Sequence, residues 1–151
     1  MARSIGLLLM ILLVPTAILG KGSLFLFIDV PSFLIVVGGT VGALLFSFGS
    51  GFGTALRALF RASVDKHTLQ TGIEFYDRAK TYLIAWGVIG FFLGMVLMLA
   101  NLTDPDSLGP GLAVSLITVF YGLIFGYGLC MPITCLLQGR LDRLEQPNQN
   151  N

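Results

Sequence analysis

Long apolar runs separated by short polar segments make up most of the chain. Two of these runs, Trp86–Ala100 and Leu112–Leu137, flank the polar segment Asn101–Asp106. A bilayer core requires about 20 predominantly apolar residues in a helix, so this pattern predicts two membrane helices joined by a tight turn. With the apolar runs that precede them, we expect an all-α integral membrane protein whose single membrane domain has four transmembrane helices, at about residues 5–28, 32–61, 80–101 and 108–137.

The first apolar run admits two interpretations. Ile5–Leu19 follows a short basic start and precedes the small residue Gly20, as in a secretory signal. Alternatively, the run continues to Ile28 as a first span that is kinked at Pro15. Ile5–Leu19 alone is shorter than the ~20 residues of a span, which favours the continued helix.

Charged residues are concentrated between the second and third spans. We expect a polar loop at about residues 62–79, with amphipathic helix ends on either side of Ser63–Thr71. The tail at about residues 146–151 is expected to be disordered. All but one of the nine Lys and Arg residues lie near the N-terminus, in Ala55–Lys80 or in the C-terminal segment. The positive-inside rule then predicts that both termini and the middle loop are cytoplasmic.

Small residues recur three and four positions apart on three of the expected spans. Such a stripe lets the backbone of a neighbouring helix come close, which is how membrane helices pack. The stripes also predict a homo-oligomer, because they offer more close-packing surface than one four-helix unit needs. The helix-packing candidates are Gly38, Gly39, Gly42, Gly87 and Gly126, and the same stripes carry Gly90, Gly94, Ser115, Thr118 and Gly122.

Ser115 and Thr118 are hydroxyl-bearing positions within the fourth span. Each hydroxyl could line an ion path, or it could bond to a backbone carbonyl one turn earlier and only stabilise the helix. No acidic residue lies inside an expected span, and a subunit that moves protons or sodium alone is expected to carry one. If the chain conducts, its titrating group must therefore come from a partner.

Composition narrows the possible function classes. Of the 151 residues, 55% are hydrophobic and 11% are charged, and the mean hydropathy is +0.86, whereas about a quarter of residues are charged in soluble domains. The formal net charge of +1 argues against nucleic-acid binding. We interpret Cys130 and Cys135 as apolar fillers and His67 as a solvated loop residue. We therefore expect no metal site, no cofactor and no enzymatic activity.

The order of several motifs along the chain is specific. Phe27–Thr40 opens the second span, Gly87–Gly90 and Gly94–Pro105 form the third span and its outer turn, and Leu108–Gly122 with Met131–Ile133 forms the fourth. This order resembles the MotA/PomA family of flagellar stator subunits, within the wider MotA/TolQ/ExbB proton channel superfamily. The resemblance covers all four expected spans.

The resemblance implies a pentamer that surrounds two copies of a MotB/PomB-like single-span partner in the bacterial inner membrane. The partner's membrane aspartate would carry the ion, and the complex would convert ion flow into mechanical work. An ExbB/TolQ-like energiser and a non-conducting membrane scaffold of the same fold are the alternatives. The resemblance implies an ion path along the third and fourth spans, for which the candidate lining residues are Gly90, Phe91, Gly94, Ser115, Thr118, Val119 and Gly122.

The chain departs from the family pattern in three respects. The cytoplasmic domain is reduced to about residues 62–79 and the C-terminal helix is nearly absent, which predicts a truncated form that does not contact a flagellar rotor in the usual way. The family's proline near the start of the third span is missing from Leu83–Trp86. Of three threonines in sodium-using relatives only Thr118 is present, with Phe91 and Val119 at the other two positions, which favours protons.

Overall fold

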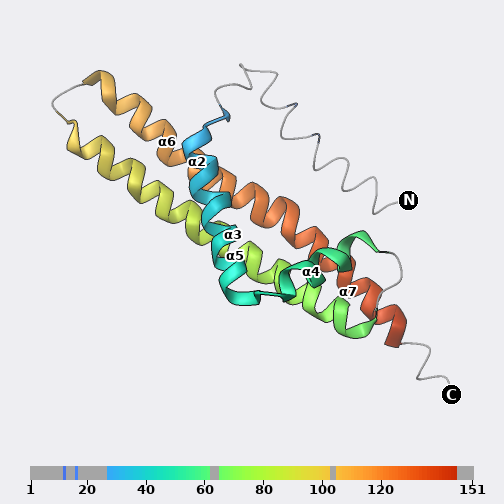
Figure 1. The fold of residues 1–151 in the computed structure, drawn as a ribbon. Helices are drawn as coiled ribbons and strands as arrows, with labels where there is room; N and C mark the ends of the chain where they lie inside the picture. The colour runs from blue at the N-terminus through green and yellow to red at the C-terminus, as the bar shows by residue number, and fades with distance from the viewer. Residues whose placement is uncertain (1–11, 13–15, 17–26, 62–64, 103–104, 146–151) are drawn as a thin grey trace.

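The computed structural model describes residues 12, 16, 27–61, 65–102 and 105–145, and within these ranges the regular secondary structure is helical throughout. The predicted first span at residues 5–28 and the predicted tail at residues 146–151 lie almost wholly outside the described residues. Figure 1 shows the helices, which in chain order are α2 (Val30–Phe33), the π-helix η2 (Leu34–Gly38), α3 (Gly39–Phe48), α4 (Gly51–Phe60), α5 (Lys66–Ala100), α6 (Pro105–Leu123), the π-helix η3 (Ile124–Cys130) and α7 (Met131–Glu145).

Three of the described helical stretches are long and apolar enough to cross a membrane. They are Val30–Phe48, Lys66–Ala100 and Leu108–Glu145. The all-α integral membrane fold predicted from the sequence is therefore confirmed, and the chain is a multi-pass membrane protein.

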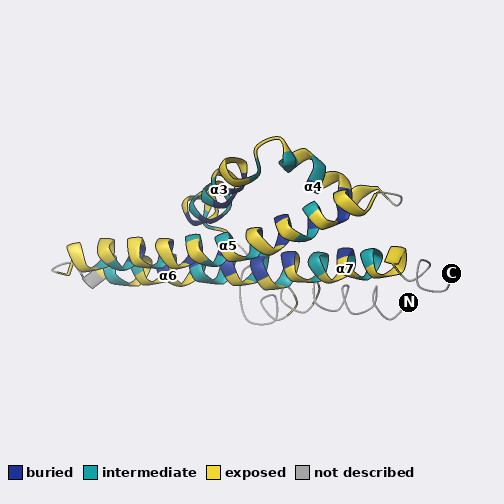
Figure 2. Cartoon of the chain, turned by 90° about the horizontal axis from the view of Figure 1, so that it is seen from below, coloured by how far each residue is buried: buried dark blue, intermediate teal, exposed yellow. Residues whose placement is uncertain are grey.

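A hairpin of α5 and α6 organises the fold. The residues that flank η3, Leu123 and Met131, have right-handed helical dihedral angles, so α6, η3 and α7 continue into one another as one long rod. This rod runs alongside α5, and α3 and α4 lie on one side of the pair (Figure 2). The hairpin thus provides the surface against which the remaining described helices pack.

The predicted second span, at residues 32–61, is interrupted between α3 and α4. α3 ends at Phe48 and α4 begins at Gly51. Gly49 between them has φ +49° and ψ −117°, a conformation that residues with a side chain rarely adopt. The turn directs α4 onto α5, where a Cβ on Gly72 would lie only 2.6 Å from the Cβ of Ala58. The hydrophobic pattern continues through this turn, which is why it predicted a single helix.

The helix that contains the third predicted span, α5, begins at Lys66, well before residue 80. Asp65 caps this helix, and its carboxylate accepts hydrogen bonds from the hydroxyl and the backbone N–H of Thr68 at 2.5 and 3.3 Å. These bonds, the hydroxyl bond first among them, lower the pKa of Asp65 below its ordinary value. The loop expected at Ser63–Thr71 is correspondingly shorter, and His67 lies in the first turn of α5.

The interior lies where α4, α5 and α7 meet. Leu69 and Leu137 are 1% and 0% exposed. The ring of Phe75 packs edge-on against those of Phe48 and Phe52, with centroids 5.2 and 5.1 Å apart. These contacts join the end of the second span to the start of α5.

Polar contacts hold the ends of these three helices together. The guanidinium of Arg140 donates to the carbonyl oxygens of Ala58 and Arg61 at 3.2 and 3.3 Å, which satisfies acceptors at the C-terminal end of α4. Lys66 and Glu145 form an ion pair at 2.6 Å between α5 and α7. The C-terminal end of α4 is therefore fixed to α7 as well as to α5.

Substitution of Gly49 tests the division of the second span. Because φ is positive, Gly49→Ala should lower the free energy of unfolding by about 1–3 kcal/mol, measured by thermal unfolding in detergent. Gly53→Ala is the control, since Gly53 is helical and a Cβ there meets nothing within 4 Å. The control should be neutral or stabilising by about 0.5–1 kcal/mol. Equal stability of the two variants would contradict the described turn.

Candidate functional site

Glycines on α5 face small residues on α6 in the uncharged part of the hairpin. A Cβ on Gly94 would lie 2.9 Å from the backbone nitrogen of Ser115, and one on Gly90 would lie 2.8 Å from the Cβ of Thr118. A Cβ on Gly122 would lie 2.7 Å from the carbonyl oxygen of Leu83. The small-residue stripes identified on the third and fourth spans thus meet each other, and the two backbones come into direct contact.

The same interface contains Gly87 and Gly126. A Cβ on Gly87 would lie 3.0 Å from the carbonyl oxygen of Thr118, and one on Gly126 would lie 3.3 Å from the carbonyl oxygen of Lys80. The close approach of the two backbones therefore extends along α5 from Gly94 to Lys80, where the charged part of this helix begins. Such contact leaves no room for a channel between α5 and α6 within the chain.

The hydroxyls of Ser115 and Thr118 are completely buried in this interface. Thr118 donates to the carbonyl oxygen of Ser115 at 2.8 Å, and Ser115 donates to that of Gly111 at 2.9 Å. Of the two interpretations given above, these contacts match the hydroxyl that bonds back to its own helix. A hydroxyl that donates in this way keeps its lone pairs free to accept a bond.

Phe91 and Val119, the other two expected path residues, lie apart from the buried hydroxyls. They line an apolar groove of about 420 Å³ on the side of the hairpin. The groove is completed by Phe27, Leu116, Ile117, Phe120 and Leu123. The seven candidate path residues therefore form two groups, a buried group of small residues and an apolar pair at a groove.

The three glycines of the second span that were predicted to pack against other helices also fall into two groups. A Cβ on Gly39 would overlap the indole ring of Trp86, so Gly39 packs directly against α5. A Cβ on Gly38 or Gly42 would meet nothing within 4 Å. These two positions therefore face away from the rest of the described chain.

A polar contact that the sequence reasoning missed attaches α2 to α6. The hydroxyl of Tyr121 donates to the carbonyl oxygen of Phe27 and accepts from the backbone N–H of Asp29 at 3.0 Å. The carboxylate of Asp29 in turn accepts from the N–H of Ser32 at 2.8 Å and caps α2. The only sequence signal was the spacing Asp29-x-x-Ser32 before an apolar run, since the partner lies 92 residues away.

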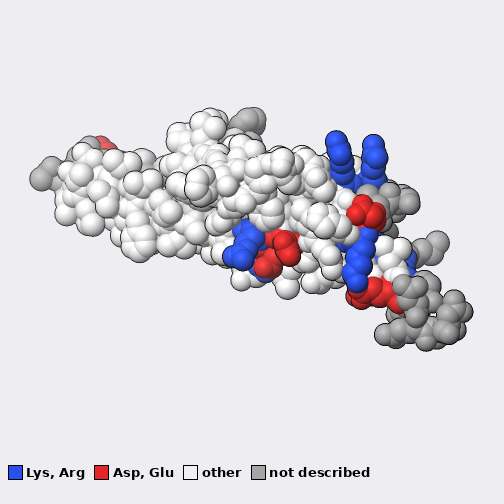
Figure 3. Space-filling view, turned by 60° about the horizontal axis from the view of Figure 1, so that its bottom comes forward, with Lys and Arg blue, Asp and Glu red and all other residues white. Residues whose placement is uncertain are grey.

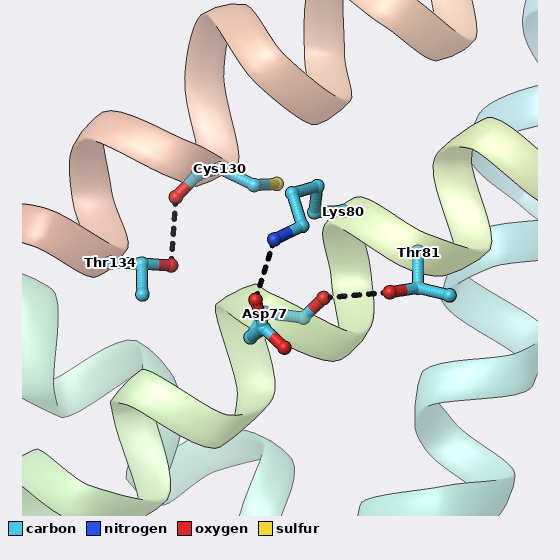
Figure 4. A network of polar contacts seen from close by, with 5 residues as sticks. All are labelled: Asp77, Lys80, Thr81, Cys130 and Thr134. Atoms are coloured by element: carbon cyan, nitrogen blue, oxygen red, sulfur yellow. Dashed lines mark hydrogen bonds and ion pairs between the residues drawn. The ribbon is translucent and has the colours of Figure 1, made fainter.

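A second polar group lies on α5 below the glycine interface. Lys80 is paired with Asp77 at 2.7 Å, and its side chain lies between Asp77 and Cys130 of η3 (Figure 4). From Thr81 to Leu102 the chain contains no Asp, Glu, Lys, Arg or His, and the same is true from Leu108 to Gly139. Lys80 and Asp77 therefore mark the boundary of the uncharged part of the hairpin. Among the described residues, no group of three or more His, Cys, Asp or Glu could hold a metal ion.

Comparison with known proteins places these features in a family. Residues 53–150 match the MotA/TolQ/ExbB proton channel family. The chain is 36% identical to Motility protein A of Aquifex aeolicus over 74 residues, which are 49% of this chain and 29% of that protein. It is 37% identical to Chemotaxis protein PomA of Vibrio alginolyticus over 91 residues, 59% of this chain and 34% of that protein.

A third relative is the uncharacterized protein YtxD of Bacillus subtilis, which is 38% identical over 71 residues, 47% of this chain and 26% of that protein. The chain thus spans 26% to 34% of the length of these three curated relatives. The matches agree with the resemblance derived from the motif order.

Substitution at Gly94 tests the backbone contact. Gly94→Ala should lower the free energy of unfolding by about 1–3 kcal/mol, because the new Cβ meets backbone atoms of Ser115 that cannot turn aside. Gly128→Ala, where a Cβ meets nothing within 4 Å, is the control. Thermal unfolding of the purified variants in detergent measures both, and a Gly94→Ala variant as stable as Gly128→Ala would show that α5 and α6 are not in contact.

Proposed function

The chain belongs to the MotA/TolQ/ExbB proton channel family, and on this premise we propose that it is a subunit of a stator-type complex that couples proton flow to mechanical work. The observation that carries the proposal is the close-packed α5–α6 hairpin, whose uncharged part holds buried hydroxyls but no ionisable carboxylate. The names of two relatives, Motility protein A and Chemotaxis protein PomA, support the same role.

A single-span partner of the MotB/PomB type supplies the titrating group in this proposal. A proton crossing a bilayer core needs a group that binds and releases it, and the uncharged part of the hairpin offers none. Two partner helices, each with one membrane aspartate, would provide it. This chain would orient those helices and exclude water around their carboxylates.

The ion path lies between subunits rather than within one. The direct contact of α5 with α6 leaves no passage inside a single hairpin. By contrast, Phe91 and Val119 lie at a groove on the side of the hairpin, where a neighbouring helix can pack. Their apolar side chains would limit leakage of ions when no carboxylate is adjacent.

A homo-oligomer, which we propose to be a pentamer, would enclose such a path. Gly38 and Gly42 are four residues apart and open to close approach by another helix. Large apolar side chains on the same span are exposed, among them Phe46 at 95%. Both features fit a span that faces lipid or a second copy of the chain.

The inner membrane, with both termini in the cytoplasm, is the proposed location. On the face shown in Figure 3, most charged side chains gather toward one end of the elongated molecule. Cations also gather where α4, the start of α5 and α7 meet, because Arg140 of α7 bonds the end of α4, which carries Arg57 and Arg61, and Lys66 of α5 pairs with Glu145 of α7. The positive-inside rule assigns a cation-rich end to the cytoplasm.

A non-conducting membrane scaffold is the second candidate. It is favoured by the bonds of Ser115 and Thr118, whose hydroxyls are satisfied within their own helix. A scaffold would need the hairpin contact but no proton flux. Flux measured with the partner present therefore separates the two candidates.

Variants at Thr118 test the proposed role of the hairpin. With the single-span partner co-reconstituted, Thr118→Ala should reduce proton flux only partly, because the small side chain still fits against Gly90. Thr118→Leu should abolish it, because the Cγ2 of Thr118 already lies 2.7 Å from a Cβ position on Gly90 and a larger side chain would separate the helices. A pH-sensitive dye inside the vesicles reports the flux. Equal flux from both variants would count against the proposal.

The transported ion should be the proton. Sodium must exchange its hydration shell for several oxygen ligands, and Phe91 and Val119 provide none in their side chains. Flux in the reconstituted complex should therefore persist when choline replaces sodium and should stop when a protonophore removes the gradient. Strict dependence on sodium would refute the proton assignment, and absence of flux under both conditions would favour the scaffold.

A further inference from the structure

The inner side of α4 is fixed against the helix pair. Ala55 and Ala58 are both 0% exposed. A Cβ on Gly72 of α5 would lie 2.6 Å from the Cβ of Ala58 and 3.1 Å from Leu137. The Arg140 bonds to the end of α4 hold it in the same orientation. The opposite side of α4 therefore stays exposed.

This outer side combines two apolar residues with two arginines. Leu56 and Phe60 are 38% and 80% exposed, and Arg57 and Arg61 are also exposed. Each pair is spaced four residues apart, so each forms one edge of the outer side. An exposed phenylalanine next to arginines is typical of helices that lie at a membrane surface.

The two arginines have no acidic partner within the described residues. Segment 51–61 contains no Asp or Glu. The described ion pairs join Lys66 to Glu145 and Lys80 to Asp77, and neither involves α4. The guanidinium groups are therefore available to an external anion.

α4 also begins close to the end of the candidate membrane span Val30–Phe48. The second span ends at Phe48, and α4 begins only three residues later at Gly51. Figure 1 shows α4 directly after the turn that ends α3. A cationic and apolar surface so close to the end of a span lies next to the lipid headgroups.

We propose that the outer side of α4 binds the anionic phospholipids of the adjacent leaflet. Arg57 and Arg61 contact the headgroup phosphates, and Leu56 and Phe60 insert at the boundary with the acyl chains. A guanidinium matches a phosphate with two parallel hydrogen bonds. The proposal requires only that Val30–Phe48 spans the membrane, and it holds whether or not the chain conducts protons.

Native mass spectrometry of the full chain in a neutral detergent tests the site. Phosphatidylglycerol and phosphatidylcholine with identical acyl chains are titrated separately. The wild type should bind phosphatidylglycerol more tightly, and the difference should shrink as ammonium acetate is raised. The double variant Arg57→Gln/Arg61→Gln should weaken phosphatidylglycerol binding about 25-fold, which is about fivefold per arginine. Phosphatidylcholine binding should change little.

Controls separate this site from general effects. Arg143→Gln removes another exposed arginine, on α7, and should leave the lipid preference unchanged. Phe60→Ser should weaken the binding of both lipids, because it removes the apolar anchor. Thermal unfolding without added lipid should be the same in the wild type and the double variant, which shows that α4 remains folded.

Three outcomes would overturn the proposal. One is equal binding of the two lipids by the wild type. Another is a double variant that retains the wild-type preference for phosphatidylglycerol, which would leave Arg57 and Arg61 to a different partner such as an acidic protein. The third is competition by inorganic phosphate at concentrations similar to those of the lipid, which would identify a site for the free anion.

Discussion

The contact between the backbones of α5 and α6 is the constraint on which the rest of the structure depends. Two apolar helices in lipid gain little from the hydrophobic effect, because the lipid tails are as apolar as the side chains, so packing must hold them together. Gly87, Gly90 and Gly94 permit this packing because they carry no Cβ at three successive contacts with α6. With α6 packed against α5, η3 and α7 also lie along α5. α4 then packs at Gly72 of α5 and Leu137 of α7.

The stripe of small residues was visible in the sequence because helical spacing alone reveals it. The membrane class and the family could also be predicted, since both depend on the order of apolar runs and motifs. By contrast, the division at Gly49 depends on a backbone angle that an apolar pattern does not encode. The contact of Tyr121 with Asp29 joins positions 92 residues apart, and a single sequence offers no signal for such a pairing.

The candidate path residues illustrate the same limit at the level of the site. Their spacing correctly groups Ser115 and Thr118 on one side of α6, but it does not determine where the hydroxyls donate. In the folded chain both donate to their own helix, and the apolar pair Phe91 and Val119 borders a groove instead. In the proposed oligomer the ion path lies between subunits, so one chain contains only the residues that would border it.

The π-helix η3 changes which side of the long rod formed by α6, η3 and α7 a given sequence position faces. In a regular α-helix, residues four apart drift by about 40° around the axis, so a contact repeated every four residues soon rotates away from its neighbour. Thr118, Gly122, Gly126 and Cys130 follow such a four-residue repeat, yet all are buried. The wider turns of η3 absorb the drift. A helical wheel drawn from Ser115 with regular α-helical spacing therefore misplaces the residues beyond Gly126. A one-residue insertion or deletion within η3 would rotate α7 about its own axis relative to α6.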